Sequence, residues 1–306
     1  MVRPLDWQRD GPQWPHHEHS RFVQAGGLHW HVQRFDGPDA AAPWALLLHG
    51  TGASTHSWRA LAPLLATHFN LITLDLPGHA FTGLPPGGAG APQLSLPGMA
   101  RAVHGLLQKL GCTPALVVGH SAGAAVALRM ALDGLIHPRL LVGLNAALLP
   151  LGGLAGQLFA PAAKLMASAP FVPRLFAWHA QTPAALQRLL DSTGSTLDRE
   201  GTELYRRLVA SPDHAAGALG MMANWDLDSF ARDLPRLAVP LLLIVGDQDR
   251  TVPPAQSEQV LQRLSPAAQA RCTHLPGLGH LAHEEQPALV AGHIVKAYED
   301  AQVVTT

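Results

Sequence analysis

Charged residues are few in this 306-residue sequence: 14% of its residues are Asp, Glu, Lys or Arg, against about a quarter in a typical soluble domain. Hydrophobic residues make up 47%, so the chain can build a large core, and intrinsic disorder is excluded. The 29 glycines and 26 prolines exclude a long coiled coil. The formal net charge is -1, so no basic field exists to neutralise phosphates, and nucleic acid is not an expected partner.

Cysteine is scarce as well. Cys112 and Cys272 allow at most one disulfide and provide no pair of metal ligands. We expect both to be reduced, as is usual in the cytosol. The N-terminal residues lack the apolar stretch of a secretory signal, so a cytoplasmic location is expected.

The longest uncharged stretch lies between Arg139 and Lys164 and has 24 residues, a length that could cross a bilayer. Its prolines, its glycines, Asn145 and Gln157 would make a poor continuous helix. We therefore predict a buried strand that leads into an apolar surface element. Peripheral contact with a membrane, including a photosynthetic membrane, remains the alternative.

Short runs rich in Leu and Val alternate with helix-like stretches along the chain. Runs that are apolar on both faces and separated by helices are typical of a parallel sheet covered on both sides, so we predict the α/β class with a mostly parallel, doubly wound sheet. Apolar and polar residues alternate in 21–34, on both sides of Gly26 and Gly27. This pattern predicts an antiparallel hairpin at the sheet edge. The clearest runs are residues 45–49, 71–76, 115–118, 140–144 and 240–245, and the last strand-like run is 271–275.

The strand pattern stops between residues 149 and 234, where prolines divide helical patterns such as 182–190 and 201–208. An insertion of this length between two strands of one sheet is too long for an ordinary loop. We predict a core made of residues 1–148 and 235–306, with a helical lid, or cap, at 149–234 after the sixth strand.

The strongest local motif is Gly-His-Ser-Ala-Gly at residues 119–123, directly after the run 115–118 and before a helical pattern. A Gly-x-Ser-x-Gly turn between strand and helix forces its serine into a strained conformation and presents the hydroxyl at the carboxyl edge of the sheet. The alternative is a chance match in a chain rich in Gly and Ala. The strand-turn-helix context favours Ser121 as a nucleophile.

A serine nucleophile needs a base that takes its proton and a third group that orients the base. Two carboxylates follow the run 240–245, and we favour Asp249 over Asp247 because it stands further along the loop. His280 follows a glycine after the last strand-like run and is the predicted base. His283 is expected to lie behind it or on a helix face.

Acyl transfer also needs hydrogen-bond donors for the developing oxyanion. The backbone amides of Ala122, after the nucleophile, and of Thr51, in the glycine-containing loop 49–54, are the predicted donors. Glycine-rich loops also bind phosphates, but no Gly-Lys-Ser/Thr follows and the spacing is not Gly-x-Gly-x-x-Gly, so nucleotide binding is the weaker alternative.

No metal and no cofactor are expected. The histidine cluster His16, His17 and His19 lacks a partner set for a metal ion. The other histidines outside the predicted site are interpreted as surface or packing residues.

The motifs HGTG, DLPGH, GHSAG, GDQD and GLGH occur in this order, and with them the sequence resembles the α/β-hydrolase superfamily over nearly its whole length. A more specific resemblance is to the BchO family of magnesium-chelatase accessory proteins in bacteriochlorophyll biosynthesis, which implies a role near magnesium insertion into protoporphyrin IX. Its strings are WHVQ (30–33), HGTGASTHSW (49–58), DLPGHAFT (75–82), SLPGMA (95–100), GHSAGAA (119–125), MMANWDL (221–227) and GHLAHEE (279–285).

The superfamily pattern implies Ser121 as nucleophile, His280 as base and then acid, and Asp249 as its orienter. It also implies cleavage of an ester, thioester or amide, since dehalogenases and epoxide hydrolases carry Asp in place of the serine. The superfamily turn usually has Gly where Ala80 stands, so an ordinary backbone conformation is expected there. Candidate lining residues for a large apolar or porphyrin-like substrate are Trp58, Leu158, Phe159, Met221, Met222 and Trp225.

The sequence therefore supports two hypotheses about function. The first is a serine hydrolase that acts on an apolar, tetrapyrrole-linked ester. The second is a non-catalytic accessory protein that binds a porphyrin or a subunit of magnesium chelatase. The full set of nucleophile, base, acid and oxyanion donors favours the first, and the naming of the resembled family favours the second.

Overall fold

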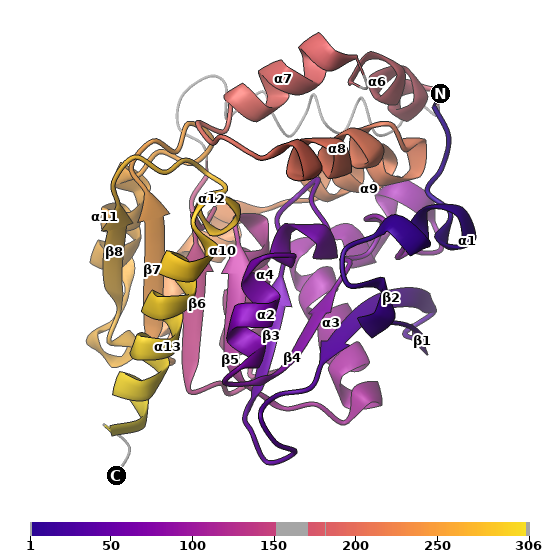
Figure 1. Cartoon of the computed structure of the whole chain (residues 1–306). Coiled ribbons are helices and arrows are strands. Elements are labelled where there is room, and N and C mark those ends of the chain that lie inside the picture. The colour runs from indigo at the N-terminus through magenta and orange to yellow at the C-terminus, as the bar shows by residue number, and fades with distance from the viewer. Residues whose placement is uncertain (1, 151–170, 181, 304–306) are drawn as a thin grey trace.

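A single eight-stranded sheet organises the computed structural model, which describes residues 2–150, 171–180 and 182–303 (Figure 1). The strand order is β1-β2-β4-β3-β5-β6-β7-β8. The β1–β2 and β2–β4 pairs are antiparallel and the other neighbours are parallel, which confirms the predicted fold class and the edge hairpin. The strands are β1 (Ser20–Ala25), β2 (Leu28–Phe35), β3 (Trp44–Leu48), β4 (Asn70–Leu74), β5 (Pro114–His120), β6 (Leu140–Leu144), β7 (Leu241–Gly246) and β8 (Arg271–Leu275).

Burial on both faces explains the continuous apolar run of the inner parallel strand β7. In β7, Leu241, Leu243 and Val245 belong to one core cluster, while Leu242 and Ile244 belong to the other. Successive side chains of a strand point to opposite faces, so each face packs against its own helical layer. The helices of the first layer are α3 (Leu96–Leu110), α4 (Ala122–Leu132) and α11 (Ala255–Arg263), and those of the second are α2 (Leu61–Ala66) and α13 (Pro287–Val303).

The described residues between β6 and β7 form helices and no strand, as the proline-divided pattern predicts. Helices α6 to α9 lie over the carboxyl ends of the strands (Figure 1). Because residues 151–170 lie outside the described ranges, the cap limits at 149 and 234 stay predictions. The helices are α6 (Val172–Ala180), α7 (Pro183–Asp191), α8 (Arg199–Val209), α9 (Pro212–Ala223) and α10 (Leu227–Asp233).

Polar side chains bind the first free amides of α7 and α8. Thr182 accepts from the Ala185 amide at the start of α7, and Asp198 accepts from the Gly201 amide at the start of α8. Each cap satisfies an amide that the helix itself leaves unpaired. The predicted helices 182–190 and 201–208 therefore correspond to α7 and α8.

Both cysteines are free, as expected. Burial raises the pKa of the Cys112 thiol to about 12, so this side chain stays protonated and behaves as a small apolar group. Among the described residues, no helix combines the length and the apolar character that a membrane span requires.

Candidate active site

Ser121 stands on a strained turn between β5 and α4, with φ 50° and ψ −118°. A side chain on either flanking glycine would collide with backbone: a Cβ on Gly119 would lie 2.4 Å from the amide nitrogen of Ala124, and one on Gly123 would lie 2.1 Å from the carbonyl oxygen of Leu48. Both glycines are therefore required by close approach. The turn places Ser121 at the carboxyl end of β5, as its motif predicts.

The structure brings His280 and Asp249 together. The Nδ1 of His280 donates to Oδ2 of Asp249 at 2.7 Å, which leaves Nε2 as the ring nitrogen free to act as a base. The Asp249 carboxylate is buried, and its Oδ1 accepts from the amides of Thr251 at 2.8 Å and Val252 at 2.9 Å. Asp247 lies elsewhere, in an exposed pair with His274.

Asn145 is a site residue that the sequence reasoning missed. Its Nδ2 donates to Oδ2 of Asp249 at 2.8 Å, so this oxygen has two donors. Asn145 follows β6 directly and has a positive φ of 45°, which Asn tolerates better than most residues. A polar residue at the carboxyl end of a buried strand was the signal that could have found it.

A second histidine supports the loop of His280. The Nε2 of His120 donates to the carbonyl oxygen of His280 at 3.0 Å, and burial lowers the pKa of His120 well below its ordinary value. His283 packs behind, with its ring centroid 4.5 Å from that of His120 and 4.9 Å from that of Trp58. The loop that carries His280 therefore packs against neutral, buried imidazoles.

The predicted oxyanion donors border the same cavity as Ser121. Within the described residues, neither the Thr51 amide nor the Ala122 amide donates to an acceptor of the protein. Gly50 allows the loop to approach, because a Cβ there would lie 3.0 Å from the Cβ of Ser121. Two unpaired amides beside a serine are the arrangement that stabilises an acyl oxyanion.

A segment of the cap forms hydrogen bonds with the loops that carry Asp249 and His280. The carbonyl oxygen of Thr193 accepts from the His280 amide at 2.9 Å and from the Arg250 amide at 3.4 Å. The Oγ of Ser195 accepts from the Leu281 amide at 2.8 Å and donates to Glu285 at 2.8 Å. This segment after α7 therefore contacts both the loop of Asp249 and the loop of His280, and no sequence motif indicates these contacts.

Close packing at this junction again requires glycine. A Cβ on Gly194 would lie 1.9 Å from the carbonyl oxygen of Gln248, and one on Gly279 would lie 2.4 Å from the Ser195 hydroxyl. Gly194 also has a positive φ of 74°, which other residues rarely adopt. The cap segment can approach the loops of Asp249 and His280 only because Gly194 and Gly279 lack side chains.

A cavity of about 490 Å³ joins the core to the cap and is bordered by both Ser121 and His280. Of the predicted lining residues, Met222 and Trp225 border it. Its other apolar walls come mainly from the cap: Phe176, Leu189, Leu190, Val209 and Leu227. Its size and lining suit a largely apolar small molecule.

Two predicted lining residues are corrected by the structure. Trp58 is fully buried in the core cluster beneath α2 and α13, and Met221 is fully buried in the opposite cluster. Neither borders the cavity, because η3 (Thr55–Trp58) turns Trp58 toward the core and Met221 lies on the inner side of α9. Met221 instead contacts the Oγ1 of Thr51 through its sulfur at 3.3 Å. Leu158 and Phe159 lie outside the described residues.

No hydrogen bond joins Ser121 to His280 within the described part of the chain. Such bonds are often long in the absence of substrate and tighten as it binds. What the structure establishes is that both residues border one cavity and that Asp249 orients the ring of His280.

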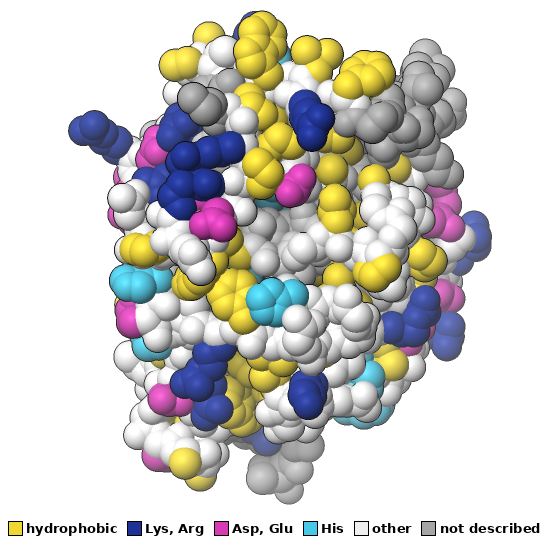
Figure 2. All heavy atoms as spheres, turned by 90° about the vertical axis from the view of Figure 1, so that its right-hand side faces the viewer, with side chains coloured by type: hydrophobic (Ala, Val, Ile, Leu, Met, Phe, Trp, Pro, Cys, Tyr) yellow, Lys and Arg dark blue, Asp and Glu magenta, His cyan; other side chains and the backbone are white. Residues whose placement is uncertain are grey.

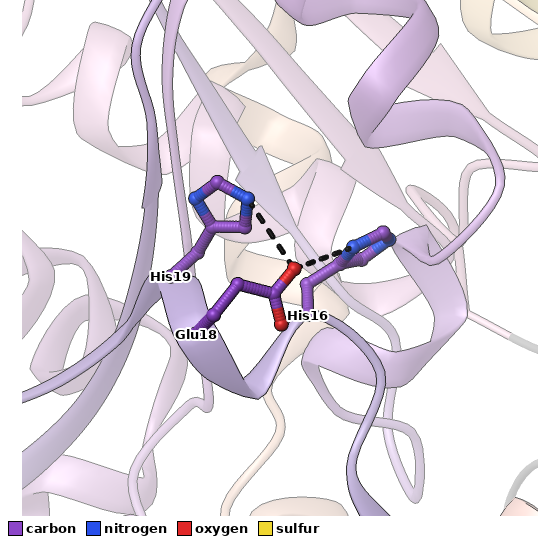
Figure 3. A group of neighbouring side chains, drawn as sticks. All are labelled: His16, Glu18 and His19. Atoms are coloured by element: carbon purple, nitrogen blue, oxygen red, sulfur yellow. Dashed lines mark ion pairs between the residues drawn. The ribbon is translucent and has the colours of Figure 1, made fainter.

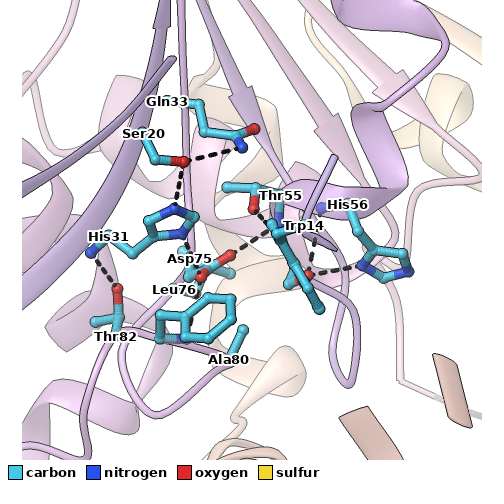
Figure 4. Close-up of polar contacts among 12 residues, drawn as sticks. Trp14, Ser20, His31, Gln33, Thr55, His56, Asp75, Leu76, Ala80 and Thr82 are labelled. Atoms are coloured by element: carbon cyan, nitrogen blue, oxygen red, sulfur yellow. Dashed lines mark hydrogen bonds and ion pairs between the residues drawn. The ribbon is translucent and has the colours of Figure 1, made fainter. Parts of the chain in front are cut away.

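A second Ser-His-Asp group, drawn in Figure 4, involves β1, β2 and the residue after β4, at the β1 edge of the sheet. The Nδ1 of His31 donates to Oδ2 of Asp75 at 2.7 Å, and the Nε2 of His31 lies 2.9 Å from Oγ of Ser20. Burial alone would raise the pKa of Asp75, but the His31 ring and the amide of Thr55 hold this pKa at about 2. None of the three residues of this group borders the cavity of Ser121.

Ala80 corrects a further expectation. Its φ is +41°, in the left-handed region and not the ordinary conformation predicted for a non-glycine residue. Two hydrogen bonds hold the turn: the Ala80 amide donates to Nδ1 of His214 at 3.0 Å, and the Phe81 amide donates to Asp75 at 3.2 Å. Tertiary contacts thus impose the conformation that Gly would adopt without strain.

Comparison with known proteins agrees with this architecture. Residues 45–293 match the alpha/beta hydrolase family, and the chain therefore belongs to the α/β-hydrolase family. Within it, the chain is 38% identical over 282 residues to a magnesium-chelatase 30 kDa subunit from Rhodobacter capsulatus, a match that covers 92% of this chain and 95% of that protein. The resemblance to the BchO family is thereby confirmed.

Other similar proteins carry enzyme names. A pimeloyl-(acyl-carrier protein) methyl ester esterase from Aeromonas hydrophila is 30% identical over 262 residues, covering 81% of this chain and 93% of that protein. A loop variant of a haloalkane dehalogenase from Bradyrhizobium elkanii superposes with a TM-score of 0.72 over 94% of this chain and 98% of the other, at 20% identity. The latter shows the fold alone, because one fold hosts several chemistries.

Proposed function

We propose that the protein is a serine hydrolase that cleaves an ester or a related acyl bond of an apolar substrate. The observation that carries the proposal is the strained Ser121, which shares a cavity with a histidine held by a buried carboxylate. A protein that only binds a ligand needs neither the strain nor the oriented ring.

The reaction follows from the positions of these groups. The Oγ of Ser121 attacks the acyl carbon while Nε2 of His280 takes the serine proton, and the same nitrogen then protonates the leaving alcohol, thiol or amine. The amides of Thr51 and Ala122 donate to the oxygen that gains charge. Water, activated by His280, releases the acid and restores Ser121. Asp249 keeps Nδ1 protonated throughout and favours the imidazolium that forms.

The apolar walls of the cavity support an apolar substrate, and the match to a magnesium-chelatase subunit supports one from the magnesium-tetrapyrrole or bacteriochlorophyll pathway. A porphyrin-like ester fits both observations. Hydrophobic side chains also gather at the cap end of the molecule (Figure 2), where Phe171, Leu175, Phe176 and Trp178 are exposed. This surface supports peripheral contact with a membrane that holds the substrate.

A second candidate function rests on the name of the relative. The protein would then bind a porphyrin or a magnesium-chelatase subunit without cleaving a bond, using the same cavity or the cap surface. The high coverage of both chains favours a shared role with that relative.

One pair of experiments separates the two functions. Purified protein is assayed on p-nitrophenyl esters of increasing chain length, and Ser121→Ala is tested for its ability to restore pigment synthesis in a phototrophic strain that lacks its own copy. The proposal predicts ester hydrolysis that Ser121→Ala loses, together with failed complementation. Full complementation by Ser121→Ala would establish the accessory function instead.

A further inference from the structure

We propose that His16, Glu18 and His19 form a binding site for one divalent cation of the zinc class. The three side chains contribute ligand atoms that all lie within 4.8 Å of one another. Figure 3 shows the two rings directed at the Glu18 carboxylate. The absence of a partner set, expected from the three histidines alone, is corrected by the glutamate between them.

Local backbone geometry puts the ligands on one side. His16 precedes the 3₁₀ turn η2 (His17–His19) and has a left-handed conformation, with φ 57° and ψ 35°. This conformation lets Nδ1 of His16 approach the same Glu18 oxygen, Oε1, that Nε2 of His19 approaches. The Nδ1 of His17 lies 3.6 Å from the other oxygen, Oε2, and His17 is not part of the group whose ligand atoms all lie within 4.8 Å of one another. The rings also have a rigid floor: Phe35 is buried and lies 4.3 Å from the ring centroid of His19 and 5.2 Å from that of His16.

Backbone carbonyls fix the tautomer of both rings. The Nε2 of His16 donates to the carbonyl oxygen of Arg59 at 2.7 Å, and the Nδ1 of His19 donates to the carbonyl oxygen of Arg34 at 3.1 Å. A carbonyl oxygen can only accept, so the proton of each neutral ring must be on these nitrogens. The other nitrogens, which face Glu18, then present lone pairs. A carbonyl on the second nitrogen is the usual support of a metal-ligating histidine.

The spacing fits a metal ion of this class. The Nδ1 of His16 lies 3.9 Å, and the Nε2 of His19 3.6 Å, from the same oxygen of Glu18. Tetrahedral zinc with bonds of about 2.05 Å separates its ligands by about 3.3 Å. The two nitrogen–oxygen pairs, and the two ring nitrogens, which lie within 4.8 Å of each other, therefore move closer together when the ion binds. Two imidazoles and one carboxylate favour zinc, cobalt or nickel over magnesium, which prefers oxygen. The exposed side of the group leaves room for water as a further ligand.

The test uses the full chain without a histidine tag, stripped with a chelator. Co²⁺ is titrated while the visible absorption of bound cobalt is followed, and Zn²⁺ is titrated by calorimetry. The wild type should bind one ion per chain at this site, and His19→Ala or Glu18→Gln should weaken binding at least about tenfold. His16→Asn tests the third ligand while it keeps a residue that tolerates positive φ.

Two control variants test whether the bound ion is at this site. His17→Ala removes the neighbouring exposed ring, and His104→Ala removes a distant histidine on α3; both should bind as the wild type does. Melting of each variant in the absence of metal verifies folding. No saturable binding by the wild type, as expected if the rings are instead protonated partners of Glu18, would overturn the proposal, as would an equal loss in His17→Ala.

Discussion

The described part of the chain contains two Ser-His-Asp groups, one beneath the cap and one at the edge of the sheet. In both, a histidine Nδ1 donates to a buried aspartate at 2.7 Å. At the edge the serine lies within hydrogen-bond distance of the ring, whereas Ser121 is not bonded to His280 among the described residues. The hydrogen-bond pattern alone would therefore favour the edge group as the reactive one.

The difference lies in what surrounds each serine. Ser121 has a strained backbone, borders a cavity of about 490 Å³ and shares this cavity with Thr51 and Ala122, whose amides have no acceptor among the described residues. Ser20 opens an edge strand, and its Oγ also accepts from Gln33 at 3.2 Å. Reactivity needs room for a substrate and donors for its charge, so we assign chemistry to Ser121 and a structural role to Ser20.

The largest expected effect is on the nucleophile. Ser121→Ala should lower kcat for ester hydrolysis by at least about 10³-fold, because the variant lacks the hydroxyl on which the acyl intermediate forms. The matched change Ser20→Ala should leave kcat within about twofold, since hydrolysis does not use the edge group. Steady-state kinetics on one ester measure both, and equal losses would break the distinction between the groups.

The two aspartates should differ in the kind of damage that their loss causes. Asp249→Asn should lower kcat by about 10³- to 10⁴-fold, because His280 then takes the wrong tautomer. Asp75→Asn should instead lower the free energy of unfolding by about 3 kcal/mol, since it disrupts a buried pair that also accepts from the Thr55 amide. Urea unfolding and kinetics on both variants measure this; loss of activity in a stable Asp75→Asn protein would contradict it.

The cap contact sharpens the comparison, because only the group of Ser121 depends on it. Ser195→Ala removes the hydroxyl that accepts from the Leu281 amide beside the base, and we expect kcat to fall between about 10- and 100-fold through misplacement of His280. KM should change little, and Ser195→Thr should restore most of the activity. A variant that changes KM alone would assign Ser195 to substrate binding instead.

The smallest effect concerns the imidazoles behind the site. Burial lowers the pKa of His283 to about 3, while the pKa of a histidine in an unfolded chain is about 6.5. Between these values the unfolded chain takes up a proton that the folded chain does not, so stability falls as the pH falls. At about pH 5.5 this residue costs about 1.4 kcal/mol.

His283→Phe should remove that part of the acid sensitivity. Urea unfolding of this variant at neutral pH and at about pH 5.5 should show a smaller drop than the wild type does, by about 1.4 kcal/mol. The exposed His68 provides the control, and His68→Gln should keep the wild-type dependence. An unchanged drop in His283→Phe would show that His283 is already charged in the folded state.

Local patterns predicted what short segments determine. The Gly-His-Ser-Ala-Gly motif specifies its own turn, because the glycines that it needs stand beside Ser121. The alternation of Leu and Val specifies the buried strands, and the choice of Asp249 over Asp247 followed from loop position and agrees with the contact to His280.

Contacts between distant segments could not be predicted in the same way. Asn145 reaches Asp249 across 104 positions, and Ser195 reaches the loop of His280 from the cap across 86. The conformation of Ala80 depends on His214, and the burial of Trp58 depends on how η3 is packed. Each of these outcomes is decided by tertiary packing, and neither periodicity nor motif spacing contains information about such contacts.

The most direct test of the central claim is covalent labelling with a fluorophosphonate, followed by peptide mass spectrometry. The probe reacts with serines that a base activates and that solvent can reach. The account predicts one adduct, on Ser121, which Asp249→Asn strongly reduces and Ser20→Ala leaves unchanged. A folded wild-type protein that shows no adduct on Ser121, or an adduct on Ser20 instead, would contradict it.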